Sequence, residues 1–351
     1  MPLASLKTKT DILRTPQPAG PVSRRVSQRA FGWVLALTLA LCVSVAWASS
    51  GDRQPLYNDC VHQCDQDICH SSNLSSQQHH QEASLRLLHW TCLDNCRYNC
   101  MHAITQDAIL RNEPVHQYHG KWPFHRFLGM QEPASVLFSL LNGYMHVRAW
   151  PTIKRTIPEG YYMRPFYLGY VVMGVNTWLW SAVYHSRDWP STEKLDYFSA
   201  GAAIMFGFYY SVIRITRMVQ TRWQLVWTVV CVIPLLLHIG FLTFVRFDYG
   251  YNMLATGGVG VVHNLMWVGW SIANRDRPYA WEPTLWGILI SLAMSLEVLD
   301  FAPLWGILDA HSLWHAATIL LIPVWYRFLL KDTEWEIQHM KGVLRTASHR
   351  D

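Results

Sequence analysis

Ser181-Ala-Val-Tyr-His185 and His311-Ser-Leu-Trp-His315 are two short polar patterns inside otherwise apolar stretches, and Asp196 follows the first pattern by eleven residues. A step of four residues returns to the same face of a helix, so each pattern predicts a helix that presents both polar side chains to one site. Ionisable groups inside membrane segments are costly and usually functional. We therefore expect an all-α membrane protein whose helices bring these five side chains together.

The overall composition also favours a membrane protein. Apolar residues make up 51% of the chain and charged residues only 15%, with 18 Trp and 16 Tyr available for the membrane interfaces. The mean hydropathy is only +0.06, so polar regions must dilute the spans. A net charge of +5 is too mild to indicate binding of nucleic acid. The expected surroundings are a lipid bilayer, with no nucleic-acid partner.

The first 48 residues have the features of a secretory leader. The apolar run 31–48 follows Arg24, Arg25 and Arg29 and closes with Ala46-Trp-Ala48. This pattern predicts a signal peptide cleaved near Ala48. The run is also almost long enough to remain as an uncut signal anchor. In either case the region 49–133 is expected to enter the lumen.

That luminal region holds six of the eight cysteines: Cys60, Cys64, Cys69, Cys92, Cys96 and Cys100. After an export signal, an even set predicts a disulfide framework, and the absence of C-x-x-C spacing makes a zinc site the weaker alternative. The near-helical spacing of each triplet suggests an antiparallel helical hairpin with nested pairs, Cys60–Cys100, Cys64–Cys96 and Cys69–Cys92. Asn73-Leu-Ser75 in the connecting loop is a glycosylation sequon.

Seven apolar stretches follow, each near the length that a bilayer requires. They are 134–150, 162–184, 195–215, 223–244, 253–273, 284–301 and 305–330. The sequence thus predicts seven transmembrane helices over 134–330, preceded by a small disulfide-rich domain and followed by a tail, 331–351. Cys231 lies in one of the stretches, where a packing role is expected.

Loop charge sets the orientation. Basic residues crowd the odd-numbered connections and the tail: Arg148, Lys154, Arg155, Arg164, Arg214, Arg217, Arg222, Arg275, Arg277, Arg327, Lys331, Lys341, Arg345 and Arg350. The even-numbered connections carry only Arg187, Lys194 and Arg246. Because basic loops remain cytosolic, the amino-terminal domain is expected in the lumen and the tail in the cytosol. The four polar residues of the two patterns, together with Asp196, then fall at the luminal ends of their helices.

Three imidazoles with a carboxylate and a hydroxyl at one depth favour a catalytic zinc ion. His185, His311 and His315 would be the ligands, although copper, nickel and iron also accept imidazole. Asp196 would accept a proton from the attacking water, and Ser181 would hydrogen-bond that water or the developing oxyanion. Because no G-x-S-x-G pattern is present, a serine nucleophile at Ser181 is the weaker alternative.

Further acids lie near the same end of the predicted bundle. Asp309, Glu297 and Asp300 are candidates to hold the second nitrogen of a ligating histidine, with helix capping or interfacial solvation as the alternative. The isolated histidines His146, His238 and His263 are expected to be buried hydrogen-bonding groups. A site that opens between helices into one leaflet suits a lipid whose ester bond lies near the headgroup.

Longer strings narrow the comparison to a family. They are Gln117-Tyr-His-Gly-Lys-Trp-Pro-Phe124, Gln131-Glu-Pro-Ala-Ser135, Thr192-Glu-Lys-Leu-Asp-Tyr-Phe198, Arg246-Phe-Asp-Tyr-Gly-Tyr-Asn252 and Asp309-Ala-His-Ser-Leu-Trp-His315. The polar patterns resemble the seven-span hydrolase superfamily of alkaline ceramidases and adiponectin and progestin receptors. The strings resemble its Per-type members, which remodel GPI lipids.

That resemblance implies a zinc-dependent hydrolase that removes the sn-2 acyl chain from GPI-anchored proteins, in the membrane of the endoplasmic reticulum or Golgi. It gives His185, His311 and His315 the role of zinc ligands and gives Asp196 and Ser181 the handling of water. A ceramidase-like amidase, a seven-span receptor with a structural zinc and an ion carrier are the alternatives. Receptor-like members usually lack a large disulfide-bonded luminal domain. A carrier would need polar residues along a path through several spans, whereas the polar residues of this chain cluster at one end.

The orientation gives the first testable prediction. A glycosylation sequon engineered beyond Lys331 should stay unmodified, because the basic loops place the tail in the cytosol. A glycosidase-sensitive shift in gel mobility measures this, with the same sequon placed in 49–133 as the positive control. Efficient glycan addition beyond Lys331 would show that the orientation is inverted.

Overall fold

The computed structural model describes residues 49–70 and 82–348. Within these ranges the chain is helical and contains no β-strand, only three isolated bridges. An all-α architecture is therefore confirmed for the described residues. The predicted leader, Cys42 and the sequon at Asn73 lie outside them.

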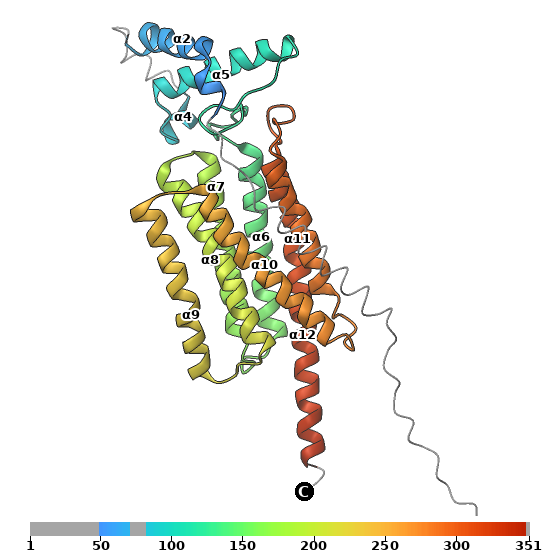
Figure 1. Ribbon diagram of the computed structural model, residues 1–351. Helices are drawn as coiled ribbons and strands as arrows, with labels where there is room; N and C mark the ends of the chain where they lie inside the picture. The colour runs from blue at the N-terminus through green and yellow to red at the C-terminus, as the bar shows by residue number, and fades with distance from the viewer. Residues whose placement is uncertain (1–48, 71–81, 349–351) are drawn as a thin grey trace, which may run out of the picture.

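Two groups of helices follow one another along the chain (Figure 1). The amino-terminal group is η1 (Gly51–Arg53), α2 (Pro55–Cys64), η2 (Asp65–Cys69), α4 (Ala83–Leu87) and α5 (Cys92–Leu110). The bundle is α6 (Pro133–Thr156), α7 (Arg164–Ser186), α8 (Pro190–Ile215), α9 (Thr221–Gly240) with η3 (Phe241–Val245), α10 (Tyr249–Ala273), α11 (Glu282–Leu299) and α12 (Ala310–Ser348). The amino-terminal group caps one end of the bundle, and α12 extends beyond the other.

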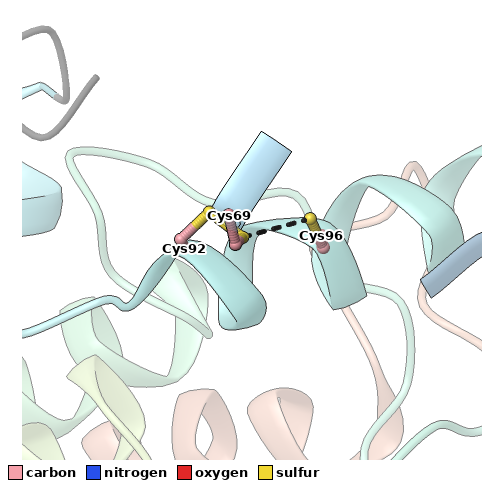
Figure 2. A group of neighbouring side chains, drawn as sticks. All are labelled: Cys69, Cys92 and Cys96. Atoms are coloured by element: carbon pink, nitrogen blue, oxygen red, sulfur yellow. Dashed lines mark hydrogen bonds between the residues drawn. A yellow bond between two sulfur atoms is a disulfide. The ribbon is translucent and has the colours of Figure 1, made fainter. Parts of the chain in front are cut away.

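Disulfides hold the amino-terminal group together. The nested pairs are Cys60–Cys100, Cys64–Cys96 and Cys69–Cys92, which join α2 and η2 to α5, so the predicted pairing is confirmed. Figure 2 shows the bond between Cys69 and Cys92, with Cys96 beside them. The sulfur of Cys96 is 3.8 Å from that of Cys69. These sulfurs are oxidised, so the cluster offers no thiolate to a metal.

The start of α5 shows how local sequence positions this domain. Thr91 accepts a hydrogen bond from the backbone N–H of Asp94, and the Asp94 carboxylate accepts one from the backbone N–H of Thr91. This reciprocal pair is a capping box, which satisfies backbone donors that would otherwise be unpaired. It fixes the first turn of α5 beside Cys92 and Cys96. The cysteine-rich domain is therefore rigid at the end that faces the bundle.

The bundle is built around α6, α7, α8 and α12. Helix α6 packs against α7 and α12, α8 packs against α7, α9 and α10, and α11 packs against α10 and α12. Aromatic side chains fill its core, with Trp267, Trp325 and Phe328 at most 1% exposed. Helix α9 lies on the outside, and apolar residues such as Leu236 and Leu237 are 60% and 69% exposed. An exposed apolar surface of this kind is expected where lipid replaces water.

The predicted number of membrane spans is only partly supported. Three stretches of the described residues are long and apolar enough to cross a membrane: Pro190–Ile215, Thr221–Val245 and Ala310–His339. The other long helices fall below that standard. In α7, for example, aromatic, glycine and polar residues such as Tyr170, Gly174 and Asn176 interrupt the apolar sequence. Seven helices of the described residues match the seven predicted stretches in order, but only three of them are candidate spans, and the crossing of the membrane stays a prediction.

Two boundaries differ from the sequence prediction. Helix α11 ends at Leu299, because Asp300 has a left-handed backbone with φ 31°. The predicted seventh stretch begins too early, since Trp305 and Gly306 also have positive φ values of 55° and 68°. Left-handed residues cannot continue a right-handed helix. Helix α12 therefore starts at Ala310, directly before His311.

The disulfide framework gives a prediction about thiols and stability. Alkylation of the denatured, non-reduced protein should modify Cys231, the one free cysteine of the described residues, and none of the six paired cysteines. Removing the central pair with Cys64→Ser and Cys96→Ser should lower the free energy of unfolding of this domain by about 2–5 kcal/mol. Mass spectrometry and thermal melting measure the two effects, with Cys231→Ser as the control. Alkylation at any of the six would contradict the framework.

Candidate metal centre

Three histidine side chains meet at the end of the bundle beside the cysteine-rich domain. His185 lies in the last turn of α7, while His311 and His315 occupy the first two turns of α12. The Nε2 atom of His311 is 3.3 Å from Nε2 of His185 and 3.0 Å from Nε2 of His315. Two segments more than a hundred residues apart thus bring three ring nitrogens to one point.

The other ring nitrogen of each histidine has its own partner. Nδ1 of His185 lies 2.8 Å from Oε2 of Glu132, and Nδ1 of His311 lies 2.6 Å from Oε2 of Glu297. Nδ1 of His315 lies 3.0 Å from Oγ of Ser139. Because an ionised carboxylate only accepts hydrogen bonds, Nδ1 of His185 and of His311 must carry the proton.

This assignment determines what faces the centre. When both rings are neutral, as metal ligands must be, the proton on Nδ1 leaves the Nε2 lone pairs of His185 and His311 facing each other at a distance where two lone pairs repel. A cation between them removes that repulsion. Ligands of a tetrahedral zinc ion at about 2.0–2.1 Å are separated by about 3.3–3.4 Å, close to the observed spacings. The donor set therefore fits a divalent metal that prefers imidazole.

Ser181 belongs to a short chain of hydroxyl groups beside His315. Its Oγ atom lies 3.0 Å from Oγ of Ser139, which in turn contacts Nδ1 of His315. Ser139 and Ser181 are 0% and 4% exposed, so the chain is shielded from solvent. When Nδ1 of His315 donates to Ser139, Ser139 can donate to Ser181. The hydroxyl proton of Ser181 then remains free for another acceptor.

Asp196 lies in the second turn of α8 and is partly buried. His185, His311 and Lys121 are close enough to interact electrostatically with its carboxylate. Its side chain makes no hydrogen bond among those observed between the described residues, which leaves its oxygens available to a water or a substrate. The structure thus brings Asp196 near the histidines without tying it to them.

The three acids expected to support the histidines have different positions. Glu297 contacts His311 and also accepts a hydrogen bond from the Tyr249 hydroxyl at 3.3 Å. Asp309 instead caps α12, because its carboxylate accepts from the backbone N–H of Ser312 at 2.8 Å. Asp300 accepts hydrogen bonds from Gln117 and Trp122 of the amino-terminal domain. Neither Asp309 nor Asp300 takes the expected position beside a histidine nitrogen.

The sequence did not reveal Glu132 and Ser139 as partners of the histidines, or Lys121 as the partner of Glu132. The ammonium of Lys121 lies 2.6 Å from Oε1 of Glu132. Burial by itself raises the pKa of the Glu132 carboxyl, but the charge of Lys121 and the hydrogen bonds from Lys121 and His185 outweigh it and hold this pKa well below its usual range. Glu132 belongs to one of the five strings that carry the family resemblance, and it directly precedes Pro133, the first residue of α6. That placement marks a helix start, and it carries no information about a histidine fifty-three residues away.

The histidines expected to have no metal-binding role have ordinary polar partners. His146 lies 2.8 Å from the Tyr326 hydroxyl, His238 lies 3.1 Å from the Asn252 side chain, and His263 lies 3.1 Å from the Ser211 hydroxyl. They are dispersed over α6, α9 and α10. His146 and His263 are buried hydrogen-bonding groups, as expected, whereas His238 is only partly buried. Cys231 is likewise buried, in agreement with a packing role.

Comparison with known proteins gives a consistent family. The model of the Per1-like family matches residues 82–333. The Xenopus laevis protein named GPI-specific phospholipase A2-like PGAP3 is 40% identical over 300 residues, which cover 85% of this chain and 94% of its own. The Protein PER1 homolog of Schizosaccharomyces pombe is 38% identical over 310 residues, or 86% and 92% of the two chains. The human PGAP3 protein is 35% identical over 296 residues, or 84% and 92%. No solved structure matches the chain.

The fold and the site define a helical membrane protein with a disulfide-bonded amino-terminal domain and a histidine cluster at the adjoining end of its bundle. The family match covers the bundle, the second half of the cysteine framework and all three histidines. The chain belongs to the Per1-like family. The membership expected from the five sequence strings is confirmed.

The support of His311 by Glu297 can be tested through metal binding. Glu297→Gln should lower the affinity for zinc about 10–100-fold, because the neutral amide no longer favours a proton on Nδ1 of His311. Competition with a chelator on the purified protein measures this affinity. Glu334→Gln is the control, since Glu334 is exposed and contacts Gln338 on the same helix. Equal zinc affinity in Glu297→Gln and the unaltered protein would show that Glu297 does not support the ligand.

Proposed function

We propose that this protein is a zinc-dependent hydrolase that removes the sn-2 acyl chain of GPI lipids on GPI-anchored proteins. The observation that carries the proposal is the convergence of three Nε2 atoms, with carboxylates behind two of the rings that hold their protons on Nδ1. Two relatives that cover most of the chain are named GPI-specific phospholipase A2-like, which supports a GPI lipid as the substrate. The products would be a fatty acid and a lyso-GPI.

His185, His311 and His315 would hold the metal through Nε2. A bound zinc ion supplies a water whose pKa falls to about 7 and polarises the ester carbonyl. Asp196 would accept the proton of the attacking water, since its carboxylate lies within electrostatic range of two of the histidines. After the bond between the acyl carbon and the sn-2 oxygen breaks, Asp196 would return the proton to that oxygen.

Ser181 would stabilise the negative charge that develops on the carbonyl oxygen. The hydroxyl chain from His315 through Ser139 leaves the Ser181 proton free to donate to an oxyanion. The same contacts argue against Ser181 as the nucleophile. A nucleophilic serine needs a base that takes its proton, and the neighbour of Ser181 in the described structure is another hydroxyl.

The position of the site fits a lipid with a reactive bond near its headgroup. The histidines lie at the end of the bundle that the cysteine-rich domain covers. With that domain in the lumen, as the loop charges predict, the site faces the luminal leaflet of the endoplasmic reticulum or Golgi membrane. The attached protein would then occupy the same compartment as the site.

Single substitutions separate metal binding from proton transfer. His311→Ala should lose zinc and activity together, because it removes a ligand. Asp196→Asn should keep most of the zinc while hydrolysis falls about 10²–10⁴-fold, the usual contribution of a general base. Ser181→Ala should slow hydrolysis about 10²–10³-fold, as expected for the loss of one oxyanion donor. The measurement is zinc content beside fatty-acid release from a purified GPI lipid.

The same assay distinguishes the alternatives. Full hydrolysis by a zinc-free His311→Ala protein would contradict the metal mechanism. An acyl group trapped on Ser181 would instead establish a serine nucleophile. Release of fatty acid from ceramide, with none from a GPI lipid, would replace the esterase with an amidase. His146→Ala is the control, because His146 is a buried histidine of α6 that contacts Tyr326.

A further inference from the structure

The segment between α5 and α6 reaches the histidine cluster directly. Lys121 follows a tight turn that brings the backbone N–H of Lys121 to the carbonyl of Tyr118 at 2.9 Å. Its ammonium contacts Oε1 of Glu132, whose Oε2 contacts Nδ1 of His185. Glu132 is only 4% exposed, so both of its oxygens are held by these two partners away from solvent. A continuous line of contacts therefore runs from the amino-terminal domain to the centre.

The backbone strengthens this connection. The N–H groups of Gln131 and Glu132 donate to the carbonyls of Ser186 and His185, both at 3.0 Å. These carbonyls lie in the last turn of α7, where a helix has no further N–H of its own to satisfy them. The segment before α6 therefore satisfies the end of α7 and sets the position of the Glu132 side chain. Lys121 then fixes the orientation of that side chain.

A second contact joins the disulfide-bonded helices to the same end of α7. Trp90 lies between two guanidinium groups, with Arg126 at 3.3 Å and Arg187 at 3.6 Å from its ring. Arg187 also pairs with Asp94 of α5 at 2.9 Å. Arg187 is two residues beyond His185. Asp94 lies between Cys92 and Cys96, which form disulfides with Cys69 and Cys64. The cysteine framework is thus linked to the residue range that holds the ligand.

The domain also contacts the element that supports His311. Gln117 and Trp122 donate hydrogen bonds to the carboxylate of Asp300 at 3.0 Å and 2.7 Å. Asp300 directly follows α11, three residues beyond Glu297. The backbone N–H of His125 donates to the carbonyl of Gly306, in the turn before α12, at 2.8 Å. One short segment therefore touches the ends of α7 and α11 and the start of α12.

We propose that Lys121 is a positioning residue for the histidine cluster, and that the cysteine-rich domain acts through it as part of the metal centre. By holding Glu132 as an oriented carboxylate, Lys121 keeps the proton of His185 on Nδ1 and its lone pair toward the metal. The inference rests on the proposed function only for the presence of the metal. It assigns to the cysteine-rich domain a role in preparing the histidine cluster, separate from any contact with the GPI-anchored protein.

A simple structural ion pair is the competing explanation. Buried ion pairs often add little net stability, and removal of one partner is damaging because it leaves the other charge unpaired. A loss of stability in a Lys121 variant would therefore not identify its role. Metal affinity is the property that a positioning residue alters and a distant ion pair does not.

The chain offers a matched control at the other end of the bundle. Lys331 of α12 forms a short ion pair with Glu282 of α11. It lies sixteen residues beyond His315, about 24 Å along the helix axis at the usual helical rise. Lys331→Met therefore removes a similar pair far from the histidines. Lys121→Arg is the conservative variant, because it retains a cation that can hold Glu132.

The test is the zinc affinity of the full-length protein in lipid nanodiscs, measured by chelator competition, together with the absorption spectrum of its cobalt form. Lys121→Met should lower zinc affinity about 10–100-fold and alter the cobalt bands, which report ligand geometry. Lys121→Arg should restore most of the affinity. Lys331→Met should match the unaltered protein. Unchanged affinity and spectrum in Lys121→Met would overturn the proposal.

A double substitution keeps the test decisive if Lys121→Met folds poorly. Adding Glu132→Gln removes the fully buried carboxylate that Lys121 pairs with, while Asp188, the other partner of Lys121 at 3.7 Å, is partly exposed to solvent. If Lys121 acts through Glu132, the double variant should bind zinc as Glu132→Gln alone does. A further loss of affinity in the double variant would contradict the proposal. Zinc binding that depends on Lys121, in a protein that releases no fatty acid, would reject the hydrolase function and leave the positioning role intact.

Discussion

The close approach of the His185, His311 and His315 rings is the interaction on which the arrangement of this end of the bundle depends. A ring that binds a metal through Nε2 places its proton on Nδ1, so it needs a partner behind it that can accept a hydrogen bond. Glu132 before α6, Glu297 near the end of α11 and Ser139 within α6 fill these positions. The ends of three helices and their connecting loops are therefore constrained by the protonation of three rings.

The opposite end of the bundle contains a second constraint. Arg214 of α8 forms two hydrogen bonds with Asp332 of α12, at 2.6 Å and 2.8 Å, and Arg277 contacts the same carboxylate at 3.2 Å. This bidentate geometry fixes the relative position of the two helices. Because α8 carries Asp196 and α12 carries two of the histidines, the network also limits how far these groups can move apart.

Periodic features of the sequence were sufficient for several predictions. The four-residue spacing in each polar pattern correctly placed His311 beside His315, and the spacing of six cysteines predicted the nested disulfides. Both inferences use the repeat of a single helix or a hairpin. The approach of His185 to His311 followed from orientation, because loop charge assigned both to the same end.

Contacts between distant segments were harder to predict. Lys121, Glu132 and Ser139 belong to different local structures, and no spacing relates them to the histidines that they support. Asp309 illustrates the opposite case, since its closeness in sequence to His311 suggested support of a ligand, whereas its position favours capping of α12. Tryptophan and tyrosine lower the mean hydropathy of a helix even where it faces lipid. Composition therefore identifies the long helices of this bundle better than it identifies membrane spans.

The central claim is that three imidazole nitrogens bind a zinc ion at this end of the bundle. X-ray absorption at the zinc edge, recorded on the purified protein in lipid, tests it most directly. The account predicts stoichiometric zinc with three nitrogen ligands and one oxygen ligand at about 2.0–2.2 Å. A protein without zinc, or a spectrum dominated by sulfur at about 2.3 Å, would contradict it.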